Sequence, residues 1–112
     1  MKFLCMAFGD EEEWNKLSKT EQDVFLAQDE VLRRRGDTVA AVDQDAVTVR
    51  AWDGTPHVTD GPFAHSPQSF AGFGIIEAKD LDEAIQLIAQ TPCARVRGAV
   101  EIRRITEINA GA

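Results

Sequence analysis

The chain contains few of the residues from which disulfide frameworks, metal sites and nucleic-acid surfaces are built. Its two cysteines, Cys5 and Cys93, are far apart and form no C-x-x-C pattern, so neither a disulfide framework nor a metal site is expected. The 12 Lys and Arg are outnumbered by 19 Asp and Glu, which gives a formal charge of −7. An acidic surface repels phosphate backbones, and we therefore expect no nucleic-acid partner.

Long hydrophobic runs are also missing. No apolar segment approaches the ~20 residues that a membrane-spanning helix needs. Residues 1–8 are apolar but too short for a secretory signal, and they lead directly into acidic sequence. The sequence thus predicts no membrane partner and a cytoplasmic, reducing location.

Two motifs that carry well-defined chemistry are absent as well. No glycine-rich loop follows a strand and opens a helix, as a nucleotide phosphate site requires. Ser66 and Ser69 lie in no nucleophile-elbow sequence. No cofactor is expected.

What remains is the composition of an ordinary globular domain. Hydrophobic residues make up 44% of the chain and charged residues 28%, which is too apolar for a disordered protein. A length of 112 residues is typical of one domain, so we predict a single domain over 1–112. Its last residues, 107–112, are predicted to form a loose tail.

Hydrophobic periodicity and turn residues predict two helices and six strands. Ser18 and Glu21 have the spacing of a capping box, and Gly36 suits the end of the helix that follows. Asp80 and Glu83 repeat the pattern for a second helix, which Pro92 ends. Asp53-Gly54 predicts a hairpin. The predicted strands are 2–8, 38–42, 46–52, 55–59, 70–78 and 100–105, and the helices are 19–35 and 81–91.

One stripe of the first helix is predicted to face the core. Its members recur at helical spacing: Val24, Phe25, Gln28, Val31 and Leu32.

The order of these elements predicts an α+β fold. Strand-helix-strand occurs twice around a hairpin, which is the ferredoxin-like split βαβ plan with an antiparallel sheet and both helices on one face. Strand 2–8 is apolar on both faces, so the other face of the sheet also needs a cover. We expect a homodimer in which two sheets stack.

The stretch Asp60-Gly61-Pro62-Phe63 is the most informative of the chain. Gly61 tolerates a positive φ and Pro62 fixes its own, which together make a sharp, rigid turn. In a purely structural interpretation Asp60 bonds to the backbone of that turn and Phe63 plugs the core. In a functional one, these four residues bind a small organic ligand.

His57, Asp60 and His65 are the candidate catalytic residues. Histidine exchanges protons near neutral pH, and an aspartate bonded to one ring nitrogen fixes the tautomer of the other. His57 and Asp60 are three residues apart and need not share a face of a strand, whereas His65 lies beyond the turn. The spacing of the three matches no metal-ligand motif, so no metal site is predicted.

The element Thr59-Asp60-Gly61-Pro62-Phe63, in its setting, resembles the DGPF branch of the YCII-related superfamily. Further matching segments run in order along nearly the whole chain: 8–11, 47–50, 53–54, 72–73, 81–84, 94–95 and 100–103. The resemblance implies a dimeric α/β barrel. Some members carry a helix histidine proposed as catalytic, but Phe25 occupies that position here. His65, Pro67 and Gln68 also replace the charged residues that usually follow the motif.

Two hypotheses follow. The first is a non-catalytic dimeric module that binds a small molecule or has a regulatory role. The alternative is a small cofactor-free enzyme that uses Asp60 and a nearby histidine for acid–base chemistry on an organic, possibly aromatic, substrate.

Overall fold

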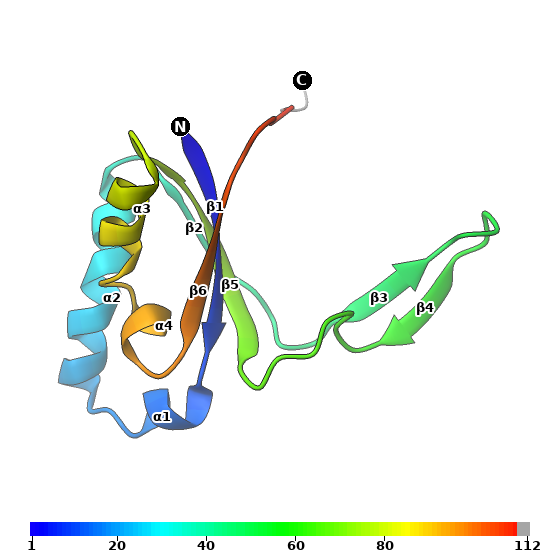
Figure 1. Cartoon of the computed structure of the whole chain (residues 1–112). Helices are drawn as coiled ribbons and strands as arrows, with labels where there is room; N and C mark the ends of the chain where they lie inside the picture. The colour runs from blue at the N-terminus through cyan, green and yellow to red at the C-terminus, as the bar shows by residue number, and fades with distance from the viewer. Residues whose placement is uncertain (110–112) are drawn as a thin grey trace.

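The computed structural model describes residues 1–109, which form a four-stranded sheet, a separate hairpin and four helices (Figure 1). The helices are α1 (Glu11–Asn15), α2 (Lys19–Arg34), α3 (Leu81–Ile88) and α4 (Pro92–Arg95). The strands are β1 (Lys2–Gly9), β2 (Thr38–Ala41), β3 (Val47–Arg50), β4 (His57–Asp60), β5 (Ser69–Glu77) and β6 (Ala99–Arg104).

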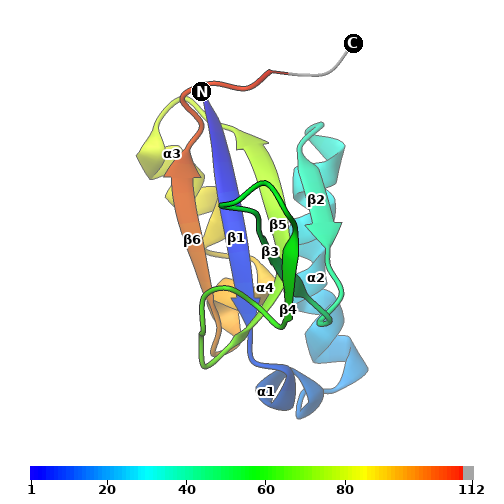
Figure 2. The ribbon, with the colours of Figure 1, turned by 90° about the vertical axis from the view of Figure 1, so that its right-hand side faces the viewer.

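The main sheet has the order β2-β5-β1-β6, and every neighbouring pair is antiparallel. All the helices lie on one side of it, as Figures 1 and 2 both show. The predicted mixed α+β fold with antiparallel strands is thereby confirmed. The sheet is open, with β2 and β6 as its edges, and the described part of the chain closes no barrel. None of the helices in that part is long and apolar enough to cross a membrane.

The helix starts follow from local capping. Ser18 and Glu21 form the predicted capping box, in which each side chain bonds the backbone N–H of the other residue. The Asp80 carboxylate accepts from the N–H of Glu83 and so caps α3. The prediction for Pro92 was wrong: α3 ends at Ile88, and Pro92 opens α4 instead, where its missing N–H costs nothing.

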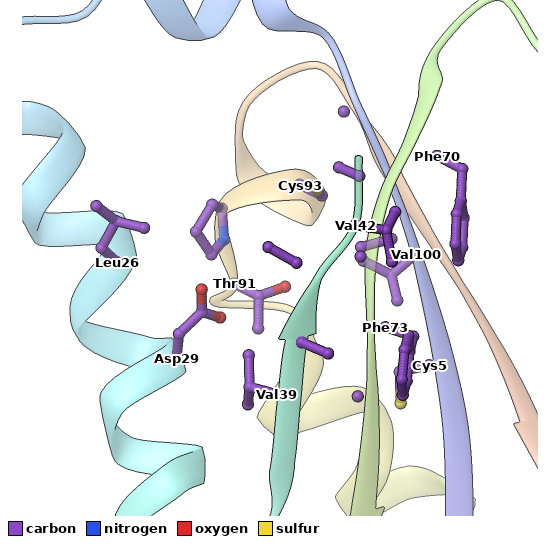
Figure 3. Close-up of a pocket in the computed structure, with 18 of the residues that line it drawn as sticks. Cys5, Leu26, Asp29, Val39, Val42, Phe70, Phe73, Thr91, Cys93 and Val100 are labelled. Atoms are coloured by element: carbon purple, nitrogen blue, oxygen red, sulfur yellow. The ribbon is translucent and has the colours of Figure 1, made fainter. Parts of the chain in front are cut away.

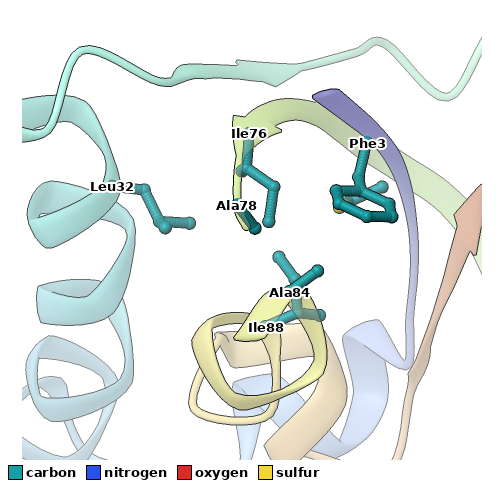
Figure 4. Close-up of a cluster of buried hydrophobic side chains, with 7 residues drawn as sticks. Phe3, Leu32, Ile76, Ala78, Ala84 and Ile88 are labelled. Atoms are coloured by element: carbon teal, nitrogen blue, oxygen red, sulfur yellow. The ribbon is translucent and has the colours of Figure 1, made fainter. Parts of the chain in front are cut away.

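The core lies between the sheet and the helices (Figure 4). Phe3 and Ile76 are directly opposite each other on β1 and β5, and both are fully buried. Side chains from α2 and α3 complete the cluster, and its buried members are Phe3, Cys5, Leu32, Ile76, Ala78, Ala84 and Ile88.

The inward face of α2 differs from the predicted stripe. Val24 and Val31 are 67% and 46% exposed. Four residues that are partly buried define the packed face together with the buried Leu32: Gln22, Phe25, Gln28 and Asp29. Polar members of this face form specific contacts, such as the Gln28 side-chain amide, which donates to the Leu87 carbonyl of α3 at 2.8 Å. Phe25, Gln28 and Leu32 are therefore placed as predicted, Val24 and Val31 are not, and Gln22 and Asp29 were left out because hydrophobicity alone counts polar residues as solvent-facing.

The sheet's other side carries a second apolar surface. Because side chains alternate along a strand and Phe3 and Cys5 face the helices, Leu4 and Met6 point the opposite way. We call this surface the open face. Its partly buried apolar side chains are Leu4, Met6, Phe8, Phe70, Phe73 and Ile75.

The hairpin of β3 and β4 stands apart from the main sheet (Figure 1). We call residues 46–61 the arm. Its strands end at Arg50 and begin again at His57, so the connection is longer than the two-residue turn expected from Asp53-Gly54. Gly54 still makes the tip of the turn, with a φ of 85°.

Candidate functional site

The Asp60-Gly61-Pro62-Phe63 turn lies at the base of the arm. Gly61 has the positive φ that the sequence predicts, at 102°. Its N–H donates to the Ala46 carbonyl at 2.8 Å, and its own carbonyl accepts from the Thr48 hydroxyl at 2.8 Å. The backbone of Ala46, just before β3, and the hydroxyl of Thr48 in β3 therefore hold the turn.

The histidine and carboxylate expected to pair do not meet. His57 is opposite Arg50 and Asp60 is opposite Val47, so they point to different faces of the arm. The His57 ring instead contacts Asp53, with 3.2 Å between Nε2 and Oδ2. The sequence left open whether His57 or His65 pairs with Asp60, and the pairing of His57 with Asp60 is therefore wrong. His65 is exposed in the following loop, and its role stays a prediction.

Phe63 does not plug the core. It is 75% exposed, and the Arg50 guanidinium lies 5.4 Å from the centre of its ring. Asp60 and Gly61 line an open hollow with Val47, at the base of the arm. Ligand binding by Asp60, Gly61, Pro62 and Phe63 thus stays a prediction, on a surface somewhat more open than the cavity beneath α2.

That cavity lies between α2, α4 and the side of the sheet that faces the helices (Figure 3). It has a volume of about 490 Å³ and a mostly apolar lining. Such a volume falls within the range typical of small-molecule sites, about 300–1,000 Å³. Trp14 from α1, Leu26 from α2, Val39 from β2 and Val96 after α4 belong to its wall.

The cavity exists because the sheet residues beneath α2 are small. Ala7, Gly72 and Ala41 lie side by side on neighbouring strands and all line it, as does Gly74. Further along the same strands Phe3 and Ile76 fill the space with the core. Small residues at one end and bulky ones at the other leave room for a molecule at one end only.

Three acidic residues line this mostly apolar cavity: Asp10, Glu11 and Asp29. The Asp10 carboxylate accepts from the N–H of Glu13, and the Glu11 carboxylate accepts from the Gln44 side-chain amide. Asp29 projects from α2 towards Thr91 and α4 (Figure 3). Burial raises the pKa of the Asp29 carboxyl, and the Arg33 charge only partly opposes that effect. A carboxyl with a raised pKa in a mostly apolar cavity is a typical feature of ligand and proton-transfer sites.

The two cysteines on the wall are poor nucleophiles. Burial and then the charge of Asp37 raise the pKa of the Cys5 thiol to about 11. Burial and then the charge of Asp29 raise the pKa of the Cys93 thiol. Both thiols therefore stay protonated near neutral pH. Among residues 1–109, no group of three His, Cys, Asp or Glu is placed to hold a metal ion.

The sequence contained a signal for Asp29 that hydrophobic patterning overlooks. Gln22, Phe25, Asp29 and Leu32 are spaced by three, four and three residues, which places them on one face of a helix. A carboxylate in line with a buried leucine indicates an inward-facing charge.

The titration of Asp29 predicts how stability depends on pH. Folding raises the pKa of Asp29, so its contribution to the stability of the folded state is fully present below the ordinary aspartate pKa of 3.8. That contribution is lost as the pH rises through the pKa of the folded protein. Asp29→Asn is expected to match the wild type below the ordinary aspartate pKa and to be more stable above it, by ~1 kcal/mol or less because solvent still reaches the group. Urea unfolding across this pH range measures the difference, and a variant less stable at neutral pH would contradict it.

Comparisons with known proteins identify relatives of the chain. The model of the YCII-related domain matches residues 1–109. A solved structure of 5-chloro-2-hydroxyhydroquinone dehydrochlorinase (TftG) from Burkholderia phenoliruptrix AC1100, in complex with 2,5-dihydroxybenzoquinone, is similar in fold. The TM-score is 0.50 at 18% sequence identity, over 95% of this chain and 94% of that one. No protein with a curated description matches.

Proposed function

The chain belongs to the YCII-related domain family, and we propose that it binds a small hydroxylated organic molecule, about the size of one aromatic ring, in the cavity beneath α2. The observation that carries the proposal is the partly buried carboxylate of Asp29 in a mostly apolar cavity of about 490 Å³. Apolar walls bind a ring, and one polar group orients it.

The chemistry of Asp29 limits the ligand class. An ionised carboxylate only accepts hydrogen bonds, so it selects a ligand that presents a hydroxyl donor. It also disfavours a second anion in the same enclosed space. A neutral phenol or hydroquinone meets both conditions, and the similarly folded dehydrochlorinase is named for a hydroxyhydroquinone substrate.

Binding is tested by titrating the protein with hydroquinone and following the backbone amide signals by NMR. Asp29→Asn keeps the shape of the side chain but removes its charge, and we expect it to weaken binding roughly tenfold, as for one lost charged hydrogen bond. Asp60→Asn is the matched control, because its carboxylate lies outside the cavity, and it is expected to bind like the wild type. The proposal fails if the two variants bind alike or if Asp60→Asn is the weaker.

Acid–base catalysis at the same site is the second candidate, favoured by the raised pKa of Asp29. Loss of HCl from a chlorinated hydroquinone leaves a quinone. One hydroxyl proton moves to the ring carbon that bears chlorine, and a base accepts the other hydroxyl proton while chloride departs with the electron pair of the C–Cl bond. In this chain Asp29 would be that base. Chloride release that Asp29→Asn abolishes and Asp60→Asn preserves would support catalysis, whereas binding without release supports a non-catalytic module.

The same proposal includes a homodimer, in which two ferredoxin-like sheets stack as a dimeric α/β barrel. Its support is the open face, where six apolar side chains are only partly buried: Leu4, Met6, Phe8, Phe70, Phe73 and Ile75. A contiguous apolar surface of this kind on a monomer typically marks an interface. Light scattering at micromolar concentration tests it, since a single-chain mass would remove the dimer.

A further inference from the structure

We propose that the arm is an interaction surface for a second copy of this chain, and that it packs against the sheet of that copy. The inference rests on the proposed homodimer and adds to it the element that holds the two copies together. The arm is attached to the sheet only through the chain segments at its base, and it extends on the side away from the helices (Figure 1).

The dimensions of a single chain are larger than those of a compact monomer, which indicates that part of its surface is meant to be covered by a partner. A compact domain of 112 residues has a radius of gyration of about 13 Å, whereas this chain has 15.9 Å. Its accessible surface is 8085 Å², compared with about 6,100 Å² for a compact monomer of 12.3 kDa. The excess of about 2,000 Å² is what one subunit of an obligate dimer buries, roughly 1,000–2,500 Å².

The arm also has an uncovered apolar side. Val49 is opposite Val58, and Val47 is two residues along from Val49, so the three share one side of the hairpin. They are 58%, 61% and 63% exposed in that order. We call them the valine face. A two-stranded hairpin is only marginally stable in water when it packs on nothing, so the valine face needs a cover.

A second copy supplies a surface of the right kind. The open face is apolar, and the arm rises in front of it when the molecule is viewed from that side (Figure 2). The sheet and the arm thus form two sides of a corner. A two-fold axis along that corner places each arm against the other copy's sheet, and the same contact forms twice. Each valine face then covers the part of the other copy's open face that the stacked sheets leave exposed.

The opposite side of the arm provides a matched control. Thr59 is opposite Thr48, and both point away from the valine face. Thr59→Glu places a charge on the arm without touching the valine face. The double variant Val49→Glu with Val58→Glu places two charges on it. None of these positions belongs to the buried core, so we expect the main sheet to fold normally in each variant.

Light scattering during size-exclusion chromatography separates the outcomes. We expect a two-chain mass for the wild type and Thr59→Glu, and a single-chain mass for the double variant at the same concentration. A wild-type dimer that the double variant leaves intact would overturn the arm contact but not the dimer. A single-chain wild type would overturn both.

Cross-linking tests the contact without relying on the fold of a charged variant. Val58 is replaced by p-benzoylphenylalanine, and the protein is irradiated and digested. We expect a two-chain product in which position 58 is joined to a peptide of β1 or β5, the central strands of the open face. Cross-links confined to a single chain would contradict the proposal.

Discussion

Phe3→Ala is expected to lower the free energy of unfolding by about 3–5 kcal/mol. Phe3 is 2% exposed and lies opposite the fully buried Ile76, in the middle of the core. Removing the ring forfeits its transfer energy and leaves a cavity that β1 and α3 cannot easily close. A domain of this size has only about 5–15 kcal/mol in total, so the variant is close to unfolding.

Urea unfolding at one fixed protein concentration measures the loss, because a dimer would make stability depend on concentration. Val24→Ala is the control. Its side chain is 67% exposed on α2, and the substitution is expected to change stability by no more than about 0.5 kcal/mol. Similar losses for the two variants would contradict the placement of the core.

Gly72→Ala is the second large effect, with an expected loss of about 2–3 kcal/mol from overpacking. A Cβ at Gly72 would lie 2.2 Å from the Ala40 carbonyl oxygen of the neighbouring strand. No L residue fits there unless β2 moves, and β2 supplies Val39 and Ala41 to the cavity wall. The substitution is therefore expected to weaken hydroquinone binding together with the fold.

Gly74→Ala is the matched comparison on the same strand. Its Cβ would lie 3.3 Å from the Thr38 carbonyl oxygen, which a shift of a few tenths of an ångström relieves. We expect a loss below about 1 kcal/mol and little change in the hydrogen exchange of the β2 amides. Equal losses for the two glycine variants would mean that the close approach at Gly72 does not limit the packing of β2.

Local signals predicted the parts of the fold that depend on local chemistry. The capping box of Ser18 and Glu21 and the cap at Asp80 start α2 and α3 where the sequence places them. The positive φ of Gly61 likewise follows from its own chain segment. Each of these depends on residues a few positions apart, so no knowledge of the folded surroundings was needed.

The predictions that failed concern features that depend on residues far away in the sequence. Phe63 is an apolar residue in a rigid turn, and nothing in its sequence indicates that the turn sits on a projecting arm. His57 lies between Asp53 and Asp60 in the sequence, at short spacing from each. Only the shape of the hairpin connection shows that its ring contacts Asp53. The arm itself was predicted as a hairpin, but its distance from the main sheet was not.

The cavity was not predicted because the small residues that make room for it form no recognisable sequence motif. Its space comes from Ala7, Ala41 and Gly72, which are unremarkable singly and meet only through strand pairing. Asp29 was missed because a charge in an amphipathic pattern is assigned to solvent by default. Both were missed for the same reason: a search for large hydrophobic side chains finds neither small residues that leave space nor a charged residue that faces inward.

The central claim is that the ligand site is the cavity and not the Asp60-Gly61-Pro62-Phe63 turn. The chain has two tryptophans, and each reports on a different place. Trp14 lines the cavity, whereas Trp52 is 92% exposed near the tip of the arm. The most direct measurement is the shift of the two indole N–H signals and of the amide signals of residues 57–65 in an NMR titration with hydroquinone. Binding in the cavity is expected to give a saturable shift of the Trp14 signal with the others unchanged, whereas shifts confined to residues 57–65 would place the ligand at the turn.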